Sequence, residues 1–220
     1  MGGTINAGIP RVKKDILKKF KGIPTTVISD SLNRMNTMHA GIKPLITPVK
    51  VVGQAITVQA MAGCNIGSHE AIYIAKENDV IVFDARGHTD TSVWGGIQTS
   101  AAKKRKLGGL VVDGAVRDVK EIKKSRFPVF CKGITPAGPH KGWSDNINVP
   151  VSCAGVPVIP GDIIVGDEDG VCVVPLKRAK EIIRICEETM KKEKTWLRKL
   201  NKGMSTTKIL GLDRKFKELK

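Results

Sequence analysis

Aromatic residues are scarce in this chain of 220 residues, where Phe, Trp and Tyr together make up 4%. Surfaces that bind single-stranded nucleic acid commonly stack bases on aromatic rings, so the composition disfavours such a surface. The formal net charge is nevertheless +16, and most of it lies in residues 1–21 and 177–220. We interpret these segments as basic helical ends with solvated lysine-rich faces. Attraction of a nucleic acid to this charge is the less favoured alternative.

The sequence also lacks paired cysteines and membrane-length apolar runs. It has no C-x-x-C motif, and its cysteines are widely spaced and odd in number: Cys64, Cys131, Cys153, Cys172 and Cys186. Neither a disulfide framework nor a zinc motif is indicated, and each cysteine is expected to be a small buried residue in a reducing compartment. No run approaches the roughly 18 apolar residues of a membrane span, and no signal-peptide pattern is present. We therefore expect a cytoplasmic protein without a membrane segment.

Apolar runs alternate with amphipathic helical patterns in the middle of the chain. The predicted strands are 49–61, 80–84, 110–116 and 128–133, and the predicted helices are 68–76, 94–109 and 118–125. This alternation is typical of parallel strands in a layered α/β core. A chain of this length, with 41% apolar residues, is long enough to bury one sizeable core, so we expect a single domain over residues 1–220.

The two ends of the pattern differ from its middle. Residues 10–36 predict two helices separated by Gly22 and Pro24, with Thr25 or Thr26 as the cap of the second helix. Residues 147–175 are short apolar stretches punctuated by Pro and Gly, which is typical of antiparallel sheet. Residues 176–201 repeat apolar residues every three or four positions and predict a long helix.

The strand predicted at 110–116 ends on two opposite charges, Arg117 and Asp118. Asp118, with Glu121 three residues later, has the capping-box pattern, so one interpretation is that it caps the next helix. The carboxyl ends of parallel strands are also where α/β sheets bind ligands, because helix N-termini there attract anions. Arg117 carries a fork of donors suited to a carboxylate. We therefore predict an anion-binding site at this strand end.

A second anion cradle is predicted upstream, at the residues that open the helix following the diglycine. Glycines allow a close backbone approach, and a helix start offers unpaired N–H groups. The residues concerned are Gly95, Gly96, Ile97 and Gln98.

A divalent metal ion is predicted beside this cradle, because Asp118 would bring a carboxylate oxygen to it. The four histidines have no metal-ligand spacing, so Mg²⁺ or Mn²⁺ is favoured over zinc. Glu193 interrupts the apolar stripe of the long helix, and a buried acid there would need a metal or a cationic partner. The alternative is a glutamate paired with a lysine where two subunits meet.

Several motifs together resemble one protein family. They are WGGIQTSAAKKRKLGGLVVDGAVRD, FPVFCKGITP, NVPVSCAGVPVIPGDIIVGDEDGVCVVP and KKEKTWLRKLNKG, and the similarity extends from about Thr26 to about Gly203. The chain resembles the RraA-like family, which includes class II 4-hydroxy-4-methyl-2-oxoglutarate aldolases that also decarboxylate oxaloacetate, and the regulator of ribonuclease activity A. Some members carry an older methyltransferase label, but no G-x-G cofactor loop follows a strand here.

The resemblance implies a three-layer swivelling β/β/α fold with N- and C-terminal helices, assembled as a homotrimer or hexamer. It implies that Asp118 ligates a divalent ion and that Arg117 binds a 2-oxo acid and stabilises a pyruvate enolate. Backbone N–H groups of Gly96, Ile97 and Gln98 would bind the pyruvyl carboxylate. Glu193 of a neighbouring subunit would reach the waters of the metal ion.

One position departs from the family pattern. Aldolase-type members have an Asp or Glu where this chain has Gly96, twenty residues ahead of the Arg-Asp pair. Asp90 is a candidate replacement for that acid. Two functions are therefore expected: a metal-dependent lyase acting on 2-oxo acids, and, as the alternative, a non-catalytic regulator that binds a ribonuclease or RNA.

Overall fold

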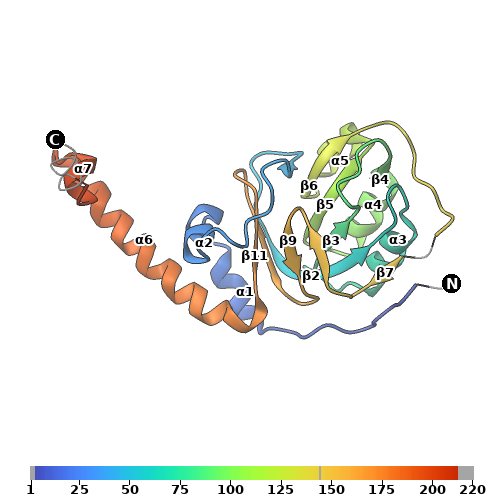
Figure 1. Cartoon of the computed structure of the whole chain (residues 1–220), viewed down its shortest axis with the longest axis horizontal. Helices are drawn as coiled ribbons and strands as arrows, with labels where there is room; N and C mark the ends of the chain where they lie inside the picture. Colours follow the sequence, from blue (N-terminus) through green and yellow to red (C-terminus); the bar gives the residue numbers. More distant parts are fainter. Residues whose placement is uncertain (1–2, 144, 213–220) are drawn as a thin grey trace.

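The computed structural model describes residues 3–143 and 145–212, which form a mixed α/β fold around one curled sheet (Figure 1). Its strands are β1 (Lys43–Pro44), β2 (Val51–Gln59), β3 (Val80–Asp84), β4 (Ser92–Trp94), β5 (Gly109–Val116), β6 (Val129–Ile134), β7 (Asn146–Ile147), β8 (Val151–Cys153), β9 (Val156–Val158), β10 (Ile163–Gly166) and β11 (Val171–Val174). Its helices are α1 (Lys14–Phe20), α2 (Thr25–Ser31), α3 (Ile66–Ile74), α4 (Gly96–Lys104), α5 (Val119–Ser125), the short 3-10 helix Leu176–Arg178, α6 (Ala179–Asn201) and α7 (Thr206–Ile209).

The large sheet has the strand order β1-β6-β5-β3-β2-β10-β11. Strands β2, β3, β5 and β6 run parallel, whereas β10 and β11 are antiparallel to their neighbours. Every residue of β3 is buried, as expected for a parallel strand covered on both faces. The predictions of parallel strands in the middle of the chain and of antiparallel pairing within residues 147–175 are both confirmed.

Two layers cover the parallel strands. Helices α3, α4 and α5 contribute Ile72, Ala102 and Ile122 to one apolar cluster, which packs on one face of the sheet. The β8–β9 hairpin packs on the opposite face through Val151 and Val158. The predicted three-layer β/β/α fold is therefore confirmed. Helices α4 and α5 begin just after the carboxyl ends of strands β4 and β5.

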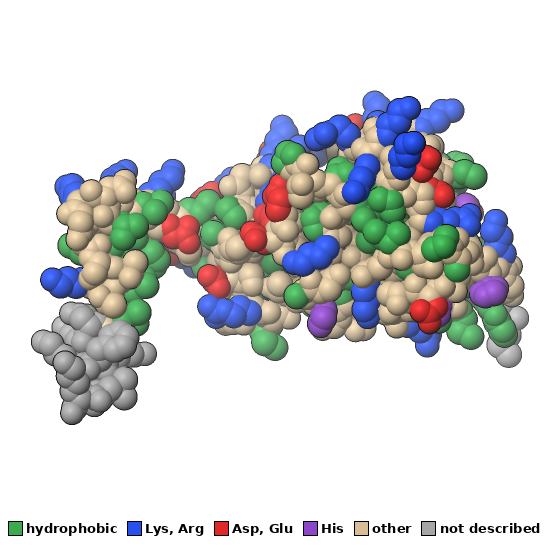
Figure 2. Space-filling model, turned by 90° about the horizontal axis from the view of Figure 1, so that it is seen from above, with side chains coloured by type: hydrophobic (Ala, Val, Ile, Leu, Met, Phe, Trp, Pro, Cys, Tyr) green, Lys and Arg blue, Asp and Glu red, His purple; other side chains and the backbone are tan. Residues whose placement is uncertain are grey.

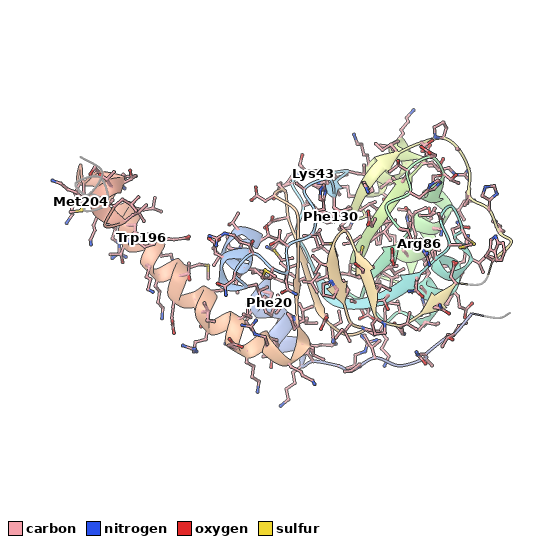
Figure 3. All side chains as sticks on the ribbon, in the orientation of Figure 1. Phe20, Lys43, Arg86, Phe130, Trp196 and Met204 are labelled. Carbon is pink, nitrogen blue, oxygen red and sulfur yellow. The ribbon has the colours of Figure 1, made fainter. Side chains whose placement is uncertain are left out.

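A third apolar cluster joins the two ends of the chain. Phe20 of α1 lies among residues of α2, the start of α6 and β10–β11 (Figure 3). The first half of α6 buries Ile182, Ile183 and Cys186 in this cluster. The second half extends beyond the rest of the chain and carries Trp196 with it (Figures 1 and 3). The long helix predicted from residue 176 is present; its first half packs on the third apolar cluster, whereas the end of its second half contacts α7.

The N-terminal segment corrects one prediction. Residues 3–13 are not helical, although residues 1–21 were predicted as a basic helical end. They run along the sheet domain instead: Ile5 bridges to Ile147, and Arg11 donates to both oxygens of Asp79, at 2.5 and 2.9 Å. These long-range contacts outweigh local helix propensity. Residues 1–2 and 213–220 of the predicted helical ends lie outside the described residues.

Two predicted helix boundaries were also wrong. Thr25 does not cap α2; it is the first residue of that helix, and its N–H and hydroxyl both donate to the buried carboxylate of Asp167. The helix predicted over 94–109 is shorter because Trp94 pairs with Val116 as strand β4 and because Lys106 adopts a left-handed conformation. Tertiary contacts decided both boundaries.

The structure also bears on the predictions that the cysteines are buried and that no helix spans a membrane. All five cysteines are free and buried, as predicted, and burial raises the pKa of Cys131 and of Cys172 to about 11. None of the helices in the described ranges combines the length and apolar character of a membrane span.

Asp167, just after β10, accepts hydrogen bonds from Thr25 of α2. We expect the loss of these bonds to destabilise the fold. Burial by itself raises the pKa of Asp167, but the two Thr25 donors and the charge of Lys50 outweigh it and lower the pKa. We expect Asp167→Ala to reduce the free energy of unfolding in urea by about 1–3 kcal/mol at pH 7, because buried donors lose their acceptor. The stabilisation from ionised Asp167 should decline as the pH falls through its lowered pKa, since protonation removes the carboxylate.

Exposed Asp169 provides the matched control. Asp169→Ala should change the free energy of unfolding by no more than about 0.5 kcal/mol. Equal losses in the two variants would contradict the role given to Asp167.

Candidate active site

A pocket of about 250 Å³ opens where α4 begins and β5 ends. Its wall is built from the start of α3, the end of β4, the first turn of α4, the residues after β5 and the loop before residue 142. The lining residues are Asn65, His69, Trp94, Gly95, Ile97, Gln98, Arg117, Asp118, Gly138, Pro139 and Lys141. The predicted location at the carboxyl ends of the parallel strands therefore coincides with a real cavity.

Asp118 does not cap α5. Its backbone is left-handed, with φ 58°, and its side chain makes no capping hydrogen bond, so the capping-box prediction was wrong. Its Oδ2 instead accepts a hydrogen bond from the N–H of Gly96 at 2.9 Å. The left-handed backbone thus directs the carboxylate across the pocket entrance to the first turn of α4.

Gly95 allows this approach. A Cβ at Gly95 would lie 2.5 Å from Oδ2 of Asp118, which is closer than Cβ contacts come, and 3.2 Å from Cγ of Arg117, which is a tight contact. The N–H of Arg117 donates to the carbonyl of Trp94 at 2.9 Å, which holds the two segments in register. The Arg-Asp pair therefore favours glycine at position 95, whereas a Cβ at position 96 would make ordinary contacts of 3.4 Å or more.

Arg117 and Asp118 lie side by side at the pocket mouth. Nε of Arg117 is 3.9 Å from Oδ2 of Asp118, and each side chain is 43% exposed. A pair at this distance and exposure is weak. The loop after β6 packs on the guanidinium, since a Cβ at Gly138 would lie 2.8 Å from its Nη1. Both charged groups consequently remain available to a ligand.

The structure brings most of the predicted cradle together, with one difference. Gly95, Ile97 and Gln98 line the pocket with the Arg-Asp pair, but the N–H of Gly96 is already used by Asp118. The side chain of Gln98 is buried and donates to the hydroxyl of Ser68 at 2.5 Å. The amide of Gln98 is thus already engaged by Ser68 and, weakly, by Asn65.

Sequence reasoning missed the opposite wall. Asn65 is 3% exposed, donates weakly toward Gln98 and His69, and has a buried side-chain oxygen without a hydrogen-bond partner among the described residues. Burial, and next the charge of Lys141, lower the pKa of His69, so its ring is neutral at pH 7. His69 and Lys141 are far apart in the sequence and belong to no motif, so the sequence could not predict that they line the same cavity.

The other predicted acids lie elsewhere. Asp90 is exposed and, although the structure describes it, is not among the residues that line the pocket. Glu193 lies half-buried in the second half of α6, the part that extends from the body of the same chain (Figure 1). Among the residues that the structure describes, Asp118 is therefore the acid that lines this pocket.

Comparison with known proteins identifies the family. The Aldolase/RraA family model matches residues 25–173. The chain belongs to the Aldolase/RraA family. It is 44% identical over 170 residues to a protein of Halalkalibacterium halodurans named "Putative 4-hydroxy-4-methyl-2-oxoglutarate aldolase", covering 77% of this chain and 81% of that relative. The predicted RraA-like membership is confirmed.

Solved structures of the family share its fold. An RraA protein of Streptomyces coelicolor, described as an unusual member of the RNase ES inhibitor RraA family, has a TM-score of 0.78 and 26% identity. The match covers 86% of this chain and 98% of that one. A Thermus RraA protein described as an RNA-processing inhibitor has a TM-score of 0.64 and 26% identity, over 69% and 92% of the two chains. The family thus includes proteins named for an aldolase activity and proteins named for RNA-processing inhibition.

The donor set of this family member suits a hard cation. Among residues 3–143 and 145–212, no group of three or more His, Cys, Asp and Glu side chains lies together as a metal site. Mg²⁺ commonly binds through one or two carboxylates and keeps several waters, so a single open carboxylate is compatible with it. Asp118 is the residue that could hold such an ion, because its Oδ1 has no hydrogen-bond partner among the described residues.

The close contact between Gly95 and the Asp118 carboxylate predicts that a larger residue at position 95 would displace that carboxylate. We expect Gly95→Ala to move the Asp118 carboxylate away from the N–H of Gly96, because a contact of 2.5 Å must open to at least 3.0 Å. A crystal structure of the variant measures this displacement. Gly22→Ala, whose added Cβ meets nothing within 4 Å, should leave the site unchanged. An Asp118 side chain that superimposes in both variants would refute the requirement for glycine.

Proposed function

We propose that this protein is a divalent-metal-dependent lyase that cleaves the C3–C4 bond of 2-oxo acids through a pyruvate enolate. The observation that carries the proposal is the pocket in which Arg117, Asp118 and the first turn of α4 converge. The aldolase name of the 44% identical relative supports the same reaction class. We propose Mg²⁺ or Mn²⁺ as the metal.

The pyruvyl half of the substrate would bind at the wall formed by α4 and Arg117. Backbone N–H groups at the start of α4, including that of Ile97, would donate to its carboxylate. Bound beside Asp118, the metal ion would polarise the 2-oxo carbonyl. The guanidinium of Arg117, held against Gly138, would stabilise the negative charge that develops on the enolate oxygen.

The opposite wall suits a second anionic group. Lys141 is a cation at the pocket edge, and neutral His69 offers a hydrogen-bonding ring beside it. The favoured substrate class is therefore a 2-oxo acid with a second carboxylate near C4, and oxaloacetate is the simplest example.

We propose that the active form is a homotrimer or hexamer. The stripe of α6 continues beyond the packed part of the helix, and Trp196, Leu197 and Leu200 are 36%, 59% and 43% exposed. Figure 2 has hydrophobic side chains on this protruding part of the molecule. A neighbouring subunit that covered this stripe would also receive Glu193, and we propose that this acid approaches the site of that neighbour.

A regulatory role is the alternative function. The absence of an acid at Gly96, the basic ends of the chain and the RNA-processing names of two structural relatives favour it. Binding of a ribonuclease or RNA that persists in Asp118→Ala and disappears at high salt would support this alternative.

Oxaloacetate turnover tests the lyase proposal. We expect pyruvate to form in the presence of Mg²⁺ or Mn²⁺ and its formation to stop when the metal is chelated. Asp118→Ala should lower kcat/KM by roughly 100-fold, or about 2.7 kcal/mol. Asp15→Ala, on the exposed face of α1, is the control and should be unaffected. Equal turnover by the unsubstituted protein and Asp118→Ala would rule out this site.

Substrates with and without a second carboxylate test the role of Lys141. We expect Lys141→Ala to raise KM for oxaloacetate about tenfold, because one charge-assisted contact to the second carboxylate is lost. KM for a 4-hydroxy-2-oxo acid without a second carboxylate should stay within about twofold. Lys104→Ala, at the far end of α4, serves as the charge-matched control. A uniform change for both substrates would assign Lys141 another role.

A further inference from the structure

A second cavity, of about 420 Å³, lies at the opposite end of the parallel strands from the candidate active site. This α1 groove is lined by residues of the segments 11–21, 52–54 and 76–79, which are α1 with the residues before it, the start of β2, and the turn before β3. It shares no lining residue with the active-site pocket. Its volume is within the range of about 300–1,000 Å³ that is typical of ligand pockets.

Lysine side chains line the α1 groove from two walls. Lys14, Lys18 and Lys21 follow one another at steps of four and three, the spacing that places side chains on one face of a helix. Lys76 lines the groove from the turn before β3. Like charges at helical spacing repel each other, so an anion bound between the two walls would stabilise this arrangement.

The groove lysines have no acidic partners. Among the residues that the structure describes, none of the four lysines forms an ion pair, whereas Lys19, outside the groove lining, lies 3.9 Å from Oε1 of Glu187. The buried acid of the groove, Asp79, is already engaged, because Arg11 donates to both of its oxygens. The N–H of Lys76 donates to the same carboxylate at 2.8 Å. The positive charges of the groove are therefore available to a ligand.

Hydrogen bonds of buried groups hold the walls of the groove in place. Oε1 of the buried Gln54 side chain accepts the N–H of Val12 at 3.0 Å. Nε2 of the same side chain donates to the carbonyls of Pro10 and Gly161, at 3.0 and 2.7 Å. These bonds join the segment before α1 to β2, and the Arg11 ion pair joins it to the turn before β3. A cavity with ordered walls loses little conformational entropy when a ligand binds.

The remaining lining residues favour a ligand that is larger than a simple inorganic anion. Val12, Leu17 and Val52 are partly buried and supply an apolar surface. Glu77 and Asn78 are exposed and supply a carboxylate and an amide, which accept hydrogen bonds from hydroxyl and amino groups. A small inorganic anion would leave the apolar surface uncovered and would be repelled by Glu77. Phosphates joined to a sugar and an aromatic base would match all three kinds of surface.

We propose that the α1 groove binds a nucleoside polyphosphate. The phosphates lie between the three lysines of α1 and Lys76, the base covers the apolar surface, and sugar hydroxyl or base amino groups donate to Glu77. This binding site is separate from the active-site pocket, and the proposal does not depend on the lyase function.

Calorimetric titration of the full-length protein with ATP tests the proposal. The titration is carried out without added metal and at about 0.15 M salt, which screens long-range attraction. We expect one ATP to bind per chain. Lys18→Ala with Lys21→Ala should weaken binding about 30-fold or more, and Lys76→Ala on the opposite wall about fivefold or more, because charge-assisted contacts are lost. Without ligand, the unfolding temperature of these variants should not fall, since the three side chains are exposed.

The matched control is Lys177→Ala with Lys180→Ala. Both lysines are exposed and lie outside the groove lining, and the control removes the same net charge as the double variant in α1. ATP should bind to it within about twofold of its affinity for the unsubstituted protein. An equal loss in the two double variants, or ATP binding that persists unchanged in the α1 double variant, would overturn the site.

Two further probes test the class of ligand. We expect inorganic tripolyphosphate to bind about tenfold more weakly than ATP, because it covers no apolar surface. Tripolyphosphate that binds as tightly as ATP would overturn the assignment of a nucleoside. Single-stranded RNA that binds through the same lysines, in a protein that does not bind ATP, would show a nucleic-acid surface and would also overturn the proposal.

Discussion

The approach of a glycine backbone to a carboxylate is the constraint on which the candidate site depends. Oδ2 of Asp118 occupies the space that a Cβ of Gly95 would need, and it accepts the N–H of the next residue, Gly96. A larger residue at position 95 would separate the start of α4 from the end of β5. The adjacent charges at the pocket mouth and the cavity behind them both depend on this contact.

Backbone contacts, more than side-chain networks, position the charged groups. The carbonyl of Trp94 accepts the N–H of Arg117, and the carbonyl of Ala137 accepts both donors of Ser92. These bonds hold β4, β5 and the loop over Arg117 in one arrangement. The two charged side chains remain half-exposed and weakly paired. A rigid frame around lightly engaged charges favours binding of a ligand, because little existing interaction has to be broken.

Much of the fold and part of the site could be predicted from local sequence. The bounds of β3 were predicted correctly, and those of β2, β5, β6 and α3 to within about two residues, because continuous apolar runs and helical periodicity are strong signals in a buried layer. Arg117 and Asp118 were found because a charge pair at the end of an apolar strand is conspicuous. Short elements such as β4 escaped notice, since three residues cannot establish a period.

The sequence by itself determined the parallel α/β core, the antiparallel segment after it, the long C-terminal helix and the strand end that carries the site. Those features depend on periodicity and composition, which are local properties. Only the tertiary structure decided that Asp118 bonds to Gly96 instead of capping α5, and that Asn65, His69 and Lys141 share its cavity. Each of these depends on how distant segments pack, and packing across a sheet edge leaves no periodic signal in the chain.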